Sequence, residues 1–558
     1  MTQLRRLPNE IIHNVLRFLD PVDLVHLSKS CKFLCSNIKN DGQLYKAIYL
    51  RILDPPLVSS CSEFDYETEL KQFVKYRRIL EDHASPEKKA EDILFVTERT
   101  SSLLRTAQPD GQNYAFLRTY FTPPSTDQKL LNLNAFASLS TTFHRALKQP
   151  QSWKQQTPPP LETRQASAKL HVLYGKALLE PAHPKYQLLY PYAVSMVYDL
   201  RNYTEETLWG PYLADGHASV DWEKLEAAML VLAHNTQQFH RSVGEDIANS
   251  VTTSASNSLT RRAWEGASPK SYRNLHLIGR EVSEEEEERD NCEEDPFGIK
   301  GTWMRVVCFL DFHDFFAYNF NSAILSRRQP RPPLQTNEAI RFIIMQLSPT
   351  HTEPPGPDDG QALPVVHFEG ISRSLYSPWD PNTNSKLKGN VRLTKEGEVR
   401  WQITSVYNGE ERWCTEGIQI GGINSARGVL GHWFDKDHDP HGPAGPTTFY
   451  KVSEQIMLDP SAVLDEESGP GSSFGIEIGI TQSSVSGVSS SLSHPQRTSC
   501  IHVRVTDFAG RLDHIAVGGL WVEPLETSVS SRPFCVSSFG SSGSARGVCP
   551  VVHGVLCW

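Results

Sequence analysis

The chain has 558 residues and a formal net charge of -10 at pH 7, with a pI of about 6.1. This length predicts two to four domains, and the acidic balance excludes a global basic surface for nucleic acid. No apolar run reaches the roughly 18 residues of a membrane span, and the N-terminus has no apolar signal-peptide region. The 10 cysteines are scattered and complete no zinc pattern, which favours reduced thiols in a cytoplasmic or nuclear protein.

The first fifty residues predict a succession of short amphipathic helices. Leu7-Pro8 opens the first one, because proline suits the first helical position. Asp20-Pro21 ends this helix and begins the next, with Asp20 as a candidate N-cap. A break near Ser30–Lys32 divides the following apolar pattern between two short helices, and a further helix begins at Leu44.

Such a small helical core is marginal alone and gains stability from a partner. These helices carry more apolar residues than their small core can bury. We therefore expect some of the following to face outward as an interface: Leu7, Pro8, Ile11, Ile12, Leu16 and Leu24.

This segment resembles the F-box, and the resemblance covers about 45 residues of the chain. F-box proteins use this module to bind the Skp adaptor of cullin–RING ubiquitin ligases. One departure is Tyr45, where the family often has Trp. The alternative is a plain helical cap on the downstream domain. The resemblance implies that the adaptor is bound by Leu7, Pro8, Glu10, Ile11, Ile12, Val15, Leu16, Leu19, Leu24, Leu27, Cys31, Leu34, Leu44 and Tyr45.

Residues 54–165 predict a helical linker region, and residues 166–245 predict a helical block. The clearest helix is Asp221–Val243, which Asp221 caps. The aromatic-rich stretch from Tyr198 to Tyr212 is either a recognition surface or core packing, and we favour packing. Residues 246–300 predict a disordered acidic loop, since Glu284–Glu288 is an unbroken acidic run.

From residue 301 to 454 the apolar residues follow the two-residue period of strands, and turns such as Asn408-Gly409 separate these strands. Eight short antiparallel strands suggest a closed barrel or a sandwich. Gly301-Thr-Trp303 resembles the first strand of calycin barrels, and Asp439–Gly445 resembles the barrel of F-box proteins that recruit substrates directly. Residues 455–558 predict a low-complexity, mostly disordered tail. The fold class is thus α+β and multidomain.

Candidate substrate-binding residues lie in the predicted barrel. Trp401, Trp413 and Trp433 either fill the core, which we favour, or line a pocket. In the loop that follows Trp433, alternating aspartates have the spacing of a calcium loop, but Pro440 replaces its required glycine. The loop is then a metal site, a pocket rim or a turn with aspartates bonded to its backbone. We retain six substrate-binding candidates and predict no metal: Trp401, Trp413, Trp433, Asp435, His438 and His441.

The sequence contains no phosphate-binding loop, His-Glu-x-x-His or Gly-x-Ser-x-Gly motif. We therefore predict a non-catalytic substrate receptor without cofactors. Its expected partners are the Skp adaptor, through it a cullin–RING ligase, and a substrate protein, with no nucleic acid or membrane. A small-ligand barrel with an accessory F-box and a metal-dependent enzyme are the alternatives.

Overall fold

The structure, a computed structural model, divides the chain into two compact units. The first comprises Met1–His144, Lys148–Leu178 and Arg262–Ser268, and the second comprises Arg145–Leu147, Leu179–Arg261 and Pro269–Trp558. The helical block predicted at 166–245 is thus divided between the units, because its first helix packs with the first unit.

The structure describes residues 8–39, 41–56, 64–108, 111–121, 130–147, 158–175, 184–243, 261–265, 295–321, 329, 331–375, 383–423, 425, 427–453, 475–483 and 498–506. Leu7, the acidic run Glu284–Glu288 and most of the predicted tail lie outside these residues.

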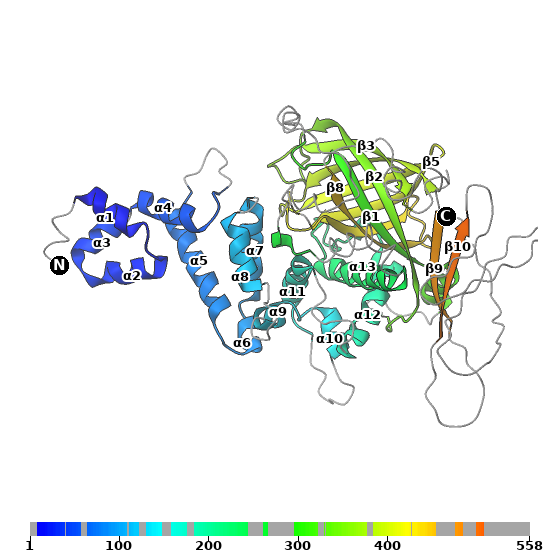
Figure 1. Cartoon of the computed structure of the whole chain (residues 1–558), viewed down its shortest axis with the longest axis horizontal. Helices are drawn as coiled ribbons and strands as arrows, with labels where there is room; N and C mark the ends of the chain where they lie inside the picture. Colours follow the sequence, from blue (N-terminus) through cyan, green and yellow to red (C-terminus); the bar gives the residue numbers. More distant parts are fainter. Residues whose placement is uncertain are drawn as a thin grey trace, which may run out of the picture. The chain divides into compact units, whose positions relative to one another are not determined.

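The described elements up to residue 175 are all helices (Figure 1). They are α1 (Asn9–Leu16), α2 (Pro21–Ser30), α3 (Lys32–Ile38), α4 (Gly42–Ile52), α5 (Tyr66–Glu81), α6 (Pro86–Ala90), α7 (Ile93–Thr106), α8 (Gln112–Phe121), α9 (Leu130–Phe136), α10 (Thr141–Leu147) and α11 (Leu161–Tyr174). The short 3-10 helix η5 (Ala263–Glu265) joins the first unit from later in the chain.

Local sequence explains how the first helices begin and end. The Asp20 carboxylate accepts a hydrogen bond from an amide of the first turn of α2 at 2.9 Å, and Pro21 takes the first helical position. Arg77 of α5 binds the same carboxylate through two nitrogens, at 2.7 and 2.8 Å, and so fixes α2 to α5. Cys31 is extended between α2 and α3, which confirms the break predicted near Ser30–Lys32.

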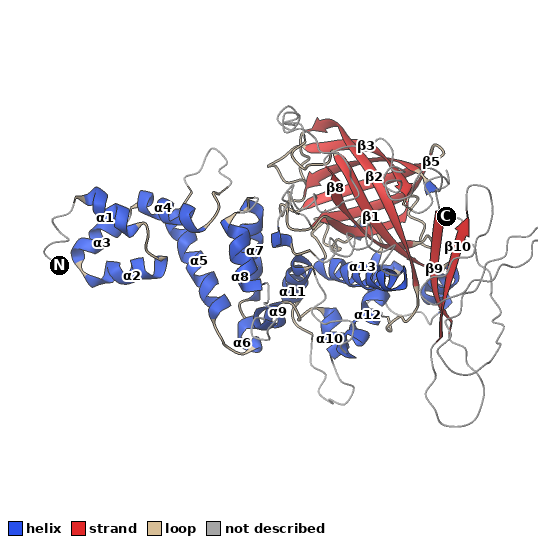
Figure 2. Ribbon diagram, viewed as in Figure 1, coloured by secondary structure: helices blue, strands red, loops and turns tan. Residues whose placement is uncertain are grey.

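The second unit combines helices with a barrel, which confirms the predicted α+β class (Figure 2). Its helices are α12 (Pro184–Val197), η3 (Leu200–Asn202), η4 (Glu205–Thr207), α13 (Trp222–Val243), α18 (Phe312–Phe316) and η6 (Ala317–Asn321). The barrel strands are β1 (Gly301–Leu310), β2 (Glu338–Glu353), β3 (Val365–Ser374), β4 (Ser385–Leu393), β5 (Val399–Tyr407), β6 (Glu410–Gln419), β7 (Val429–Asp435) and β8 (Ala444–Ser453). They pair antiparallel in chain order, and β8 pairs with β1 to close the barrel.

One end of the barrel interior is filled by large side chains. Alternate residues of each strand face inward, among them Trp303 of β1 and Trp401 of β5. The two rings lie edge to face at 5.1 Å, and both contact Phe449 of β8. Phe297 and Ile299, which precede β1, belong to the same buried cluster. We call this cluster the packed core of the barrel.

Helix α13 lies against β1, β2, β7 and β8 on the outside of the barrel. Asp221 caps this helix as predicted, because its carboxylate accepts a hydrogen bond from an amide of the first turn at 3.1 Å. The aromatic side chains of the stretch before α13 are buried. Tyr198 donates a hydrogen bond to Glu338 at 2.6 Å, and Tyr212 donates one to Glu416 at 2.9 Å. These contacts confirm the interpretation of the stretch as packing.

Two further strands, β9 (Gly475–Ser483) and β10 (Thr498–Thr506), pair antiparallel within the predicted tail. Our reading of the sequence did not predict β9, although its isoleucines alternate at 476, 478 and 480. Among the described residues, no helix has both the length and the apolar character needed to cross a membrane.

Candidate functional site

The predicted adaptor-binding residues of α1–α4 differ in their exposure. Pro8, Glu10, Ile11 and Val15 are exposed, and Leu19, Leu27, Cys31 and Tyr45 are half-buried. The buried ones are Ile12, Leu16, Leu24, Leu34 and Leu44. Of the six residues among which we expected an outward-facing set, Pro8 and Ile11 are exposed, whereas Ile12, Leu16 and Leu24 are buried. Ile12 and Leu16 lie one turn apart on the inner face of α1 and help to form the small core of these helices.

Exposed apolar side chains follow the other face of α1. The side chains of Ile11 and Val15 are 46% and 58% exposed, and that of Phe18, just beyond the helix end, is 64% exposed. Together with Pro8 they recur at steps of three and four residues, which places them along one face. We call Pro8, Ile11, Val15 and Phe18 the α1 stripe.

Our reading of the sequence missed three exposed apolar residues of these helices: Phe18, Val25 and Leu50. Phe18 continues the spacing of Ile11 and Val15, so extending the pattern by one step would have found it. Val25 and Leu50 carry no such signal, because their exposure depends on how α2 and α4 pack.

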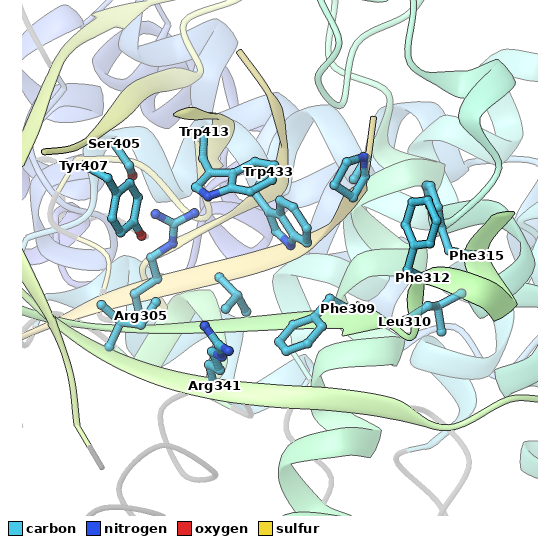
Figure 3. A pocket seen from close by; sticks show the side chains of 14 residues that line it. Arg305, Phe309, Leu310, Phe312, Phe315, Arg341, Ser405, Tyr407, Trp413 and Trp433 are labelled. Carbon is cyan, nitrogen blue, oxygen red and sulfur yellow. The ribbon is translucent and has the colours of Figure 1, made fainter. Parts of the chain in front are cut away.

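The barrel interior ends in a cavity of ≈ 100 Å³ on the side away from the packed core (Figure 3). We call it the barrel mouth. Strand β1 contributes Arg305, Val307 and Phe309, the residues that follow Trp303 on the inward face. Further lining side chains come from β2, β5, β6, β7, β8 and α18. The interior is thus packed at one end and hollow at the other.

Two of the three predicted tryptophans line the barrel mouth. Trp413 and Trp433 lie edge to face at 5.4 Å, and Trp433 Nε1 donates a hydrogen bond to the Cys308 carbonyl at 3.1 Å. Gly445 of β8 leaves room for this ring, since a Cβ there would lie 2.8 Å from Trp433 Nε1. Trp401 is fully buried in the packed core and does not line the mouth, in agreement with the core-packing alternative that we favour for it.

The loop between β7 and β8 is a set of turns. The carboxylates of Asp435 and Asp439 each accept a hydrogen bond at 2.9 Å from the amide two residues later. His438 stacks on Trp209 at 4.8 Å. These contacts confirm the turn interpretation of the aspartates. Within the described part of the chain, no group of three or more His, Cys, Asp or Glu side chains is placed to hold a metal ion.

A row of rings, exposed except for the half-buried Phe312, continues from the barrel mouth to this loop. Phe312, which lines the mouth, lies 5.9 Å from Phe316, and Phe316 lies 4.7 Å from Phe320. Phe320 in turn lies 4.8 Å from His441. We call these four residues the aromatic row. The structure therefore places three of the predicted substrate-binding residues at the mouth or in the row: Trp413, Trp433 and His441.

Comparison with known proteins adds one finding. A family model described as F-box-like matches residues 4–51. No curated protein and no solved structure matches the chain. The matched segment contains α1, α2, α3 and nearly all of α4, together with every residue of the α1 stripe.

Proposed function

We propose that this chain, in which residues 4–51 form an F-box-like domain, is the substrate-recognition subunit of a Skp–cullin–F-box ubiquitin ligase. The F-box-like domain supports binding to a Skp-type adaptor. The observation that carries the proposal is the α1 stripe. A contiguous exposed apolar patch marks an interaction surface, and burying each large side chain there would contribute about 1–2 kcal/mol.

The second unit would capture the substrate protein. Support for this role comes from the barrel mouth and from the aromatic row beside it, where Phe316 and Phe320 are 38% and 37% exposed. Aromatic side chains are frequent at the centres of protein interfaces because they bury a large area with few rotatable bonds. Loops and helices at the end of a rigid barrel also hold such side chains in fixed positions.

In this role the chain supplies no nucleophile. It would hold a substrate lysine close to a ubiquitin-charged conjugating enzyme, which raises the effective concentration of the two reacting groups. The two functions would then reside in separate units, the adaptor site in the first and the substrate site in the second.

A binding experiment with the full chain tests the adaptor site. Replacing Ile11, Val15 or Phe18 singly with Asp places a carboxylate in the α1 stripe. Since all three are exposed, each variant should fold and should lose at least about tenfold in affinity for the Skp adaptor, as measured by calorimetric titration.

Leu94→Asp is the matched control, because Leu94 lies on α7 with 48% exposure, close to the 46% of Ile11. Its affinity for the adaptor should equal that of the unmodified chain. If the variants of the α1 stripe melt like the unmodified chain and still bind the adaptor at full affinity, the docking assignment is refuted.

A further inference from the structure

Two arginines face into the barrel mouth, and none of the described side chains that line the mouth is acidic. Arg305 of β1 and Arg341 of β2 are both on the inward face, where Arg305 is 5% exposed. In the register of these strands Arg341 pairs with Val307, so the two arginines are diagonal neighbours. Diagonal neighbours on one face lie roughly 7–8 Å apart at their Cα atoms, close enough for both guanidinium groups to reach one ligand.

The contacts of Arg305 hold its side chain, but among the described residues they include no carboxylate that would pair with its charge. Its Nε donates a hydrogen bond to the Thr447 hydroxyl at 3.0 Å, and one terminal nitrogen donates to the Thr415 hydroxyl at 2.7 Å. Both partners are neutral. Burial lowers the pKa of Arg305 to about 10, so the guanidinium still carries its charge at pH 7.

Arg341 is held by an aromatic ring instead. Its guanidinium lies 5.3 Å from the centre of the Phe309 ring, a cation–π contact. The outer wall of the same barrel provides a contrast: Arg400 binds the Glu416 carboxylate at 3.0 and 2.8 Å. Two like charges in a mostly apolar hollow repel each other and lose hydration, a cost that an anion between them would offset.

We propose that the barrel mouth binds an organic anion, with a carboxylate or phosphate group against Arg305 and Arg341 and an apolar, preferably aromatic, body against Trp413 and Trp433. The planar guanidinium fork matches both anionic groups. The cavity of ≈ 100 Å³ is large enough for one such group but not for a folded domain. This inference rests on the proposed role of the barrel mouth as the recognition site.

The anion has two possible sources, a small organic acid or the terminus of a substrate protein. The test therefore has two arms, each read by tryptophan fluorescence and calorimetry on the full chain. One arm titrates phenylacetate, and the other an acetylated Ala-Ala-Ala-Phe peptide with a free carboxylate. Phenylacetamide and the peptide amide are the neutral counterparts. We expect at least one anion to bind roughly tenfold or more tightly than its amide, and the arm that binds identifies the source.

Arg341→Gln should weaken binding of that anion by roughly tenfold or more, and its fold is not at risk because Arg341 is only half-buried. Arg305→Gln should do the same. Arg373→Gln is the charge-matched control, since Arg373 alternates with the inward residues of β3, and it should bind normally.

The inference is overturned if neither anion binds or if the amides bind as tightly as the anions. It is also overturned if all three arginine variants bind the anion with the same affinity. The Phe18→Asp variant separates this result from the adaptor site, because it should bind the anion at full affinity. Anion binding without adaptor binding in the unmodified chain would refute only the ligase role, and the reverse would refute only the anion site.

Discussion

At the scale of single residues, a buried histidine on the outer wall of the barrel leads us to expect that stability depends on pH. His432 of β7 is buried between the strand and the helices, with its ring edge to face with Tyr203 at 5.5 Å. Burial, together with the nearby charge of Lys224, lowers the pKa of His432 to about 3. Lys224 donates hydrogen bonds to the backbone carbonyls of Asn202 and Tyr212 at 2.9 and 3.1 Å. Protonation of His432 would therefore bury a new positive charge close to that of Lys224.

The sign of the effect follows from the lowered pKa. Between about pH 6.5 and pH 3 the unfolded chain binds a proton at His432 that the folded chain excludes, so the free energy of unfolding decreases as the pH falls. We therefore expect the histidine to account for a loss of about 2 kcal/mol between pH 7 and pH 5. Urea unfolding at the two pH values should show this loss in the unmodified chain and a loss smaller by that amount in His432→Gln. Parallel pH profiles for the two proteins would contradict the assignment.

The tryptophans show what could be predicted for single residues and what could not. The alternation of the strands correctly indicates that Trp401, Trp413 and Trp433 share the inward face. It does not tell at which height along the barrel each lies. That height depends on the register between strands: Trp401 pairs with Gly417, while Trp413 pairs with Ser405, two inward positions further toward the mouth. Packing and pocket roles therefore separate only in three dimensions.

At the scale of elements, short-range sequence signals were sufficient to predict most of the described helices and strands. Aspartate caps at Asp20 and Asp221 and the turn at Asn408-Gly409 act within a few residues, so the sequence alone predicts them. The outward-facing set of α1–α4 was only partly predicted. Every apolar residue of α1 fits a helical face, and only the packing of the other helices decides which face becomes the core.

A pair of glycines permits the contact of β6 with β7. Gly417 and Gly431 are register partners, and a Cβ on Gly431 would lie 2.5 Å from Gly417 Cα and overlap the Glu416 carbonyl oxygen. Gly431→Ala should therefore destabilise the barrel by about 1–3 kcal/mol, seen as a lower Tm in differential scanning calorimetry. Gly42→Ala, with nothing within 4 Å of its added Cβ, serves as control and should stay within about 0.5 kcal/mol. Equal Tm values for the two variants would contradict the claim that the contact between β6 and β7 requires a residue without a Cβ at position 431.

At the scale of the whole molecule, the chain combines an F-box-like domain in its first unit with a closed barrel in its second. The sequence predicted both parts, because each is built from local periodicity. It did not predict the boundary between the units, since apolar residues follow a helical spacing both before and after residue 178. The hollow of the barrel mouth also escaped prediction, because it depends on the summed volume of side chains from six strands.

We propose that the α1 stripe binds the Skp adaptor. The most direct test is the mass of the full chain mixed with purified Skp adaptor, measured by light scattering after size-exclusion chromatography. Binding through the α1 stripe predicts one peak with the mass of a complex of one chain and one adaptor, and separate peaks for Phe18→Asp. Separate peaks for the unmodified, folded chain at micromolar concentration would contradict it.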